Sequence, residues 1–97
     1  MYKLVVRLED KDFAALERFE RQALASMGEH SGTIAEALET ARHPDGSGEE
    51  IHLLEFANET ALQAYRADGR LTALACLRDE AIANTEVKPV LQTKSHA

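Results

Sequence analysis

Hydrophobic and polar residues alternate at the start of the chain. One face of this segment carries Tyr2, Leu4, Val6 and Leu8. The other face carries Lys3, Val5, Arg7 and Glu9, of which three are charged. A period of two is typical of a strand with one buried face. We therefore predict a strand over residues 2–9 whose apolar face meets the core.

The next segment has a helical period instead. Asp10 or Asp12 is suited to cap a helix, and Gly28 favours its C-terminal stop. Between them, apolar residues recur on one stripe at about 100° per residue: Phe13, Leu16, Phe19, Ala23, Leu24 and Met27. The pattern predicts one amphipathic helix that packs this stripe against the sheet.

Residues 33–42 are compatible with two structures. Their Ala, Glu and Leu content favours a helix, whereas their spacing to the next segment suits an edge strand. We interpret them as a strand, because the turn-rich segment 43–50 and the apolar run 50–56 follow directly. Asp45 supplies turn chemistry together with the glycine after it. An antiparallel pair of strands is therefore expected here.

The second half of the chain predicts a broken helix and a last strand. Asn58 is a good N-cap for a short helix, and Asp68 with Gly69 interrupts the helix before a second piece over about residues 70–83. The last strand is expected over residues 85–91, with its proline at a sheet edge, because proline cannot donate a ladder hydrogen bond.

The order of these elements is β-α-β-β-α-β. This is the ferredoxin-like arrangement of the α+β class, in which helices cover one face of an antiparallel sheet. No repeat or linker divides the chain, so we expect a single domain over residues 1–97, with residues 93–97 as a flexible tail.

Composition narrows the range of partners. Seventeen acidic residues against eleven Lys and Arg give a net charge of -6, which disfavours nucleic acid and anionic membranes. The N-terminus has neither a secretory signal nor a membrane span, so we expect a cytoplasmic protein. The single cysteine, Cys76, excludes an internal disulfide and any multi-cysteine metal site.

The segment from residue 56 to residue 87 resembles the small dimeric α+β barrel proteins. An aromatic residue ends the third strand, a capped helix ends near a Tyr, and a Leu-x-x-Leu-x-x-x-Arg stretch leads to the last strand. In this chain those features are Phe56, Asn58, Tyr65, Leu71, Leu74 and Arg78.

This resemblance implies a homodimer in which two sheets face each other to form a barrel, with a small-molecule pocket between sheet and helices in each subunit. The superfamily includes cofactor-independent antibiotic-biosynthesis monooxygenases, isomerases, haem-degrading monooxygenases and uncharacterised stress-associated domains. The haem-degrading members use a Trp, which this chain lacks. With five aromatic residues and no Trp, a large planar cofactor is disfavoured, and we expect no cofactor.

Two residues are the main candidates for chemistry. Arg78 falls on the apolar arc of the predicted helix 70–83, where it must find an ion-pair partner, reach the surface, or anchor an anionic ligand. His52 shares a strand face with Leu54 and Phe56, and it is either a hydrogen-bonded core residue or a general acid or base. We take His52 as the catalytic candidate.

Tyr65 and Asn84 are further candidates for substrate binding. Tyr65 either packs beside the helix break or offers its phenol to the pocket. Asn84 either binds substrate or caps the preceding helix. Three histidines lack the paired spacing of a metal site, so we predict no metal: His30, His43 and His96.

Three functions remain open on this basis. The protein is a monooxygenase-like or isomerase-like enzyme acting on a small aromatic or acidic metabolite, a non-catalytic module that binds such a metabolite, or a structural dimer. No nucleophile or nucleotide-binding motif is present to specify another reaction.

Overall fold

The computed structural model describes residues 1–94. Its elements are, in chain order, β1 (Tyr2–Asp10), α1 (Phe13–Glu29), β2 (Gly32–Arg42), β3 (Gly48–Phe56), α2 (Glu59–Ala67), α3 (Gly69–Thr72), α4 (Ala75–Ala81) and β4 (Ile82–Pro89). Of the predicted tail, residues 93 and 94 have no regular structure, and residues 95–97 lie outside the described part of the chain.

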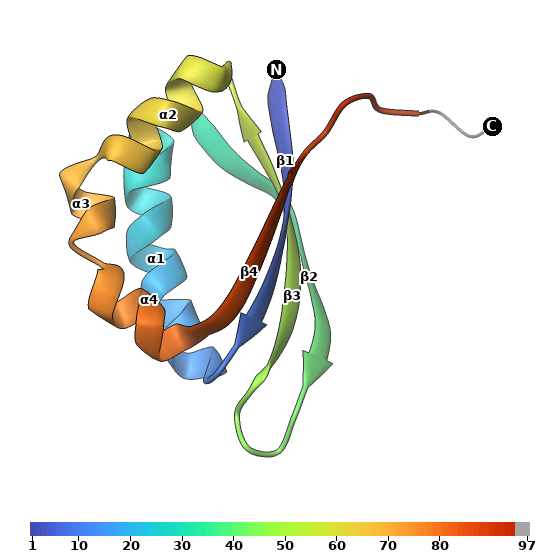
Figure 1. Ribbon diagram of the computed structural model, residues 1–97, viewed down its shortest axis with the longest axis vertical. Helices are drawn as coiled ribbons and strands as arrows, with labels where there is room; N and C mark the ends of the chain where they lie inside the picture. Colours follow the sequence, from blue (N-terminus) through green and yellow to red (C-terminus); the bar gives the residue numbers. More distant parts are fainter. Residues whose placement is uncertain (95–97) are drawn as a thin grey trace.

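The four strands form one open antiparallel sheet in the order β2-β3-β1-β4. All four helices lie on one side of it, and the opposite face carries no helix (Figure 1). This is the ferredoxin-like α+β fold that the sequence predicts. Residues 33–42 are a strand, as predicted, and the strand that contains Pro89 lies at the sheet edge.

The core lies between the sheet and the helices, because the alternating residues of β1 turn their apolar side chains to this side. Leu4, Val6 and Leu8 are buried there, and Phe56 at the end of β3 and Leu16 of α1 are fully enclosed. On the other side of the sheet, Lys3 approaches Glu55 at 3.8 Å and Arg7 binds Glu49 at 2.9 Å. The residues of β1 therefore separate into a core face and a charged, partly apolar outer face.

Side-chain caps fix the two main helices. The Asp12 carboxylate accepts a hydrogen bond from the Ala14 amide, and the Asn58 side chain accepts one from the Ala61 amide at 2.8 Å. The predicted stop at Gly28 is wrong by one residue, since α1 continues to Glu29. The Gly28 position is not needed as a stop because Ser31 takes the positive φ of 56° after the helix.

The second helical region is more broken than its sequence predicts. The interruption at Asp68 and Gly69 is confirmed, but the expected helix over residues 70–83 is wrong, because α3 and α4 are separate and Ile82 already begins β4. Ile82 pairs with Asp10 of β1, so sheet pairing ends the helix early. None of the helices within residues 1–94 is long and apolar enough to cross a membrane.

Candidate active site

A cavity of about 410 Å³ lies between the helix-covered face of the sheet and the helices. All four strands and all four helices contribute side chains to it, and most of these side chains are apolar. A volume of this size suits a small-molecule ligand. The few polar side chains that line the cavity therefore determine what chemistry it can support: Glu20, His52, Tyr65, Arg66, Thr72, Arg78 and Thr85.

His52 lies on β3 and faces the cavity, as its alternation with Ile51 and Leu53 predicts. Its side chain is only 5% exposed, and its Nε2 lies 2.7 Å from Oε1 of Glu50, two residues earlier on the same strand face. A carboxylate accepts hydrogen bonds, so this contact favours the tautomer of His52 that carries its proton on Nε2. Nδ1 then holds the ring's lone pair.

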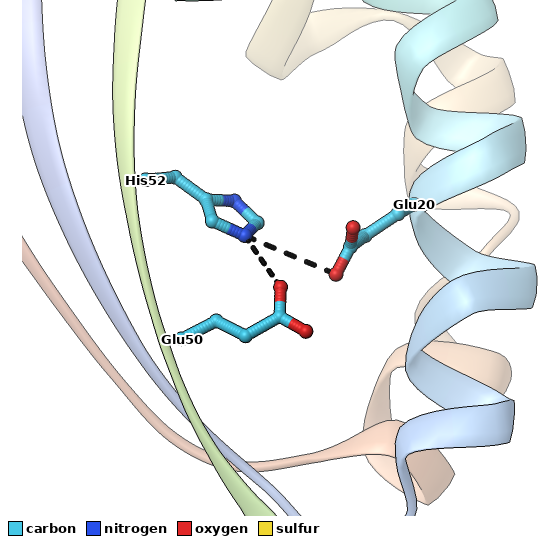
Figure 2. A group of neighbouring side chains, drawn as sticks. All are labelled: Glu20, Glu50 and His52. Carbon is cyan, nitrogen blue, oxygen red and sulfur yellow. Dashed lines mark hydrogen bonds and ion pairs between the residues drawn. The ribbon is translucent and has the colours of Figure 1, made fainter. Parts of the chain in front are cut away.

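Nδ1 points away from both carboxylates (Figure 2), and the hydrogen bond of the ring to Glu50 is made by Nε2. The contact with Glu50 thus orients the His52 ring and favours the tautomer with Nε2 protonated. This arrangement leaves one nitrogen of a well-buried imidazole available to a ligand in the cavity.

Glu20 of α1 completes the polar end of the cavity. Its Oε1 lies 3.9 Å from His52 Nε2, and the three side chains converge from the helix and the strand (Figure 2). Burial, together with the negative charge of neighbouring Glu50, raises the pKa of Glu20 to about 8. Glu20 is therefore mostly protonated at neutral pH in the metal-free protein.

Sequence reasoning missed Glu20, although a signal was present. Leu16, Ala23 and Met27 are buried residues of α1, and Glu20 stands at the same helical spacing, four residues after Leu16 and three before Ala23. An acidic residue on the core stripe of an amphipathic helix indicates either a buried polar contact or a site. Its partners on β3 are about thirty residues away in the chain, so the cluster appears only in the fold.

Tyr65 lines the cavity from α2 and is 9% exposed. Its ring packs against Phe56 with centroids 5.6 Å apart, and burial raises the pKa of its phenol. The packing role considered from the sequence is therefore present, and the residue also borders the cavity.

Arg78 reaches the surface, which is one of the three outcomes that its position on the predicted apolar arc left open. It is exposed, and Leu71, Ala75 and Ile82 of the same arc line the cavity with it. The guanidinium donates a 2.9 Å hydrogen bond to Oγ1 of Thr85 on β4, and both residues line the cavity. Arg78 therefore lies at the rim of the cavity, with its charge still accessible.

Asn84 does not join this site. It pairs with Glu9 in the sheet, and the neighbouring Thr85 pairs with core-facing Leu8, so Asn84 lies on the helix-free face. It is exposed and is not among the residues that line the cavity. His43 is exposed in the β2–β3 turn, and His30 binds Asp68 at 2.8 Å beside the helix break.

No family model matches the chain, and no curated protein sequence matches it. Solved structures do. The chain superimposes over 97% of its length on 94% of SnoaB, a cofactor-independent oxygenase from Streptomyces nogalater, with a TM-score of 0.68 and 14% identity. It also superimposes over 93% of its length on 86% of a NIPSNAP-family protein of unknown function from Agrobacterium tumefaciens, with a TM-score of 0.68 and 16% identity.

The chain is also similar in structure to a protein from Nitrosomonas europaea that is assigned provisionally to the antibiotic biosynthesis monooxygenases. It is matched over its whole length by 97% of this chain, with a TM-score of 0.71 and 12% identity. The chain therefore has the ferredoxin-like fold of the antibiotic-biosynthesis-monooxygenase-like and NIPSNAP proteins. At these identities the likeness defines the fold and leaves the activity to be argued from the site.

Proposed function

We propose that this protein is a small-molecule enzyme that works by proton transfer, of the cofactor-independent oxygenase-like or isomerase-like kind. Its substrate is a small, largely apolar molecule with an acidic proton, such as a hydroquinone, a phenol or an enolisable ketone. The observation that carries this proposal is the Glu50–His52 pair at the polar end of the apolar cavity. A non-catalytic binding module is the alternative.

His52 is the proposed general base. Glu50 holds Nε2–H and stabilises the positive charge that forms when Nδ1 accepts a proton. Removing the proton leaves a phenolate or enolate, which needs a positive or hydrogen-bonding partner. Arg78 at the cavity rim and the Tyr65 phenol are the proposed partners for that oxygen. The apolar walls exclude water from the anion formed.

The fold neighbours support this class of reaction. SnoaB has the same fold and is a cofactor-independent oxygenase, and oxygenation without a cofactor requires a substrate that the protein itself activates. We propose that deprotonation by His52 is that activation here. An isomerase would use the same step and return the proton to a second carbon.

Exchange of the substrate's acidic hydrogen with deuterium from solvent tests this proposal. A panel of hydroquinones and enolisable ketones is incubated with the metal-free protein in D₂O, with exchange at enolisable carbons followed by NMR and oxygen uptake followed for the hydroquinones. His52→Gln is expected to lower the rate about 10²–10⁴-fold, because general base catalysis contributes that much. His43→Gln, in an exposed turn, is the matched control.

Two outcomes would contradict the proposed enzyme activity or its proposed base. If the panel binds, as shown by a rise in melting temperature, but neither exchange nor oxygen uptake occurs, the cavity is a binding module. If His52→Gln retains the wild-type rate, the base lies elsewhere.

We further propose that the protein is a homodimer that buries the helix-free face of the sheet. Val5 and Leu38 are large apolar residues exposed on this face, at 37% and 49%, and Ile51 and Leu53 lie beside them half-buried. Exposed apolar side chains gathered on one face mark an association surface.

Light scattering coupled to size-exclusion chromatography measures this association. The wild type is expected at twice its 10.7 kDa mass, and Leu38→Glu is expected to weaken the dimer about tenfold or more by burying a charge. Leu91→Glu is the control, because Leu91 is fully exposed beyond the sheet. A wild type that stays monomeric at high micromolar concentration would contradict the proposal.

A further inference from the structure

We infer that Glu20, Glu50 and His52 form a binding site for a divalent transition-metal ion such as Zn²⁺. The inference stands apart from the proposed enzyme activity and does not depend on it. It also goes against the sequence-based prediction of no metal, which considered only His30, His43 and His96.

The geometry of the cluster is the first argument. Each residue offers one ligand atom, and these atoms all lie within 4.8 Å of one another, with 2.7 Å and 3.9 Å from His52 Nε2 to the two carboxylates. Ligands bound to one Zn²⁺ at about 2.0–2.2 Å are separated by roughly 3–3.6 Å. Small side-chain rotations would therefore bring all three into coordination.

The charge of the cluster is the second argument. Within residues 1–94, neither Glu20 nor Glu50 forms an ion pair with a Lys or Arg, although their side chains are only 23% and 17% exposed. Oε1 of Glu20 is a buried atom with no hydrogen-bond partner in this part of the chain. Buried acceptors of this kind need a proton or a cation.

The chemical type of the ligands narrows the ion. One imidazole and two carboxylates suit Zn²⁺, Mn²⁺, Fe²⁺ or Co²⁺ better than they suit Ca²⁺ or Mg²⁺, because the last two ions prefer oxygen ligands only. Glu20 and His52 also line the cavity, so the remaining coordination positions would be open to a ligand there. Three protein ligands with an open position are typical of reactive rather than structural sites.

Metal binding would change the role of His52. An ion at Nε2 replaces the proton that Glu50 holds in the metal-free form, and the proton of the neutral ring then lies on Nδ1 instead. Such a ring cannot accept a proton from the substrate. The cation and the proposed proton transfer are therefore alternative uses of the same side chain.

The test is metal binding by the full chain without an affinity tag, measured by calorimetry with ZnCl₂ and by the visible absorption of added Co²⁺. We expect one ion per chain and a higher melting temperature with Zn²⁺. Glu20→Gln and His52→Gln are expected to bind at least about tenfold more weakly and to lose the Co²⁺ spectrum. Glu17→Gln, exposed three residues earlier on α1, should bind as the wild type does.

Circular dichroism of each variant verifies that it is folded, and Glu20→Asp provides a second variant that keeps the carboxyl group but withdraws the ligand atom. Absence of binding to the folded wild type at millimolar Zn²⁺ would overturn the inference. Binding that all variants retain would overturn it too, since the ion would then lie elsewhere. Neither result affects the outcome of the deuterium-exchange experiment, which uses metal-free protein. The metal site and the proposed enzyme activity can therefore be disproved independently.

Discussion

Between pH 5.5 and pH 8, the metal-free wild type is expected to lose about 3 kcal/mol of unfolding free energy that the Glu20→Gln variant retains. The cause is the environment of one carboxyl group. Glu20 ionises near pH 4.5 in an unfolded chain and near pH 8 in the folded protein, where burial and the charge of Glu50 oppose its ionisation.

The sign follows from proton binding. Between these two pKa values the folded state holds one proton more than the unfolded state, so stability falls as the pH rises. The stabilisation is complete below the lower pKa and is lost once the pH passes the upper one. Since the charge of Glu50 affects the ionisation of Glu20, the difference between variant and wild type is the quantity to measure.

Urea unfolding at a series of pH values, with a chelator present, gives this difference. Asp10 also has a pKa raised by burial, but it contributes equally to both proteins. Glu59→Gln serves as the control, because Glu59 is exposed on α2 and its charge is not among those that raise the pKa of Glu20, so its curve should run parallel to that of the wild type. If Glu20→Gln also runs parallel, then Glu20 is not held in an unfavourable environment.

The largest loss of stability is expected from Phe56→Ala, at about 3–5 kcal/mol. The Phe56 side chain is fully buried, and it packs against Tyr65. Gly32 of β2 lies so close to the Phe56 ring that an added Cβ would come within 2.8 Å of it. Because Gly32 has no side chain, it cannot fill the cavity that truncation of Phe56 leaves. The total free energy of unfolding of such a domain is only about 5–15 kcal/mol.

Thermal and urea unfolding measure this effect. A loss of 1 kcal/mol lowers the melting temperature of such a domain by about 4–8 °C, so the change should be large. Leu91→Ala removes a fully exposed apolar side chain and should stay within about 0.5 kcal/mol of wild type. Equal effects of the two substitutions would show that Phe56 does not anchor the core.

The elements with strong local signals were predictable from the sequence. The alternation in β1 and the capping side chain of Asn58 are local patterns, and the edge position of Pro89 follows from the N–H that proline lacks. Even the ambiguous segment 33–42 could be assigned, because the turn after it requires a second strand to pair with.

The candidate site was only partly predictable. The inward orientation of His52 followed from strand alternation, but its partner Glu20 comes from a helix about thirty residues earlier. The end of α4 was misplaced for a different reason. The sequence predicted one helix over residues 70–83, whereas the pairing of Ile82 with Asp10 ends α4 at Ala81, which no local pattern reveals.

The two edges of the sheet bear on how copies of this chain can assemble. On one edge, β2 departs from regular register twice, after Ile34 and after Glu39, and on the other edge β4 carries Pro89. Both devices hinder the addition of a further strand. Growth of the sheet from chain to chain is thereby discouraged. The proposed dimer uses the helix-free face instead, and such a two-fold contact closes at two copies rather than propagating.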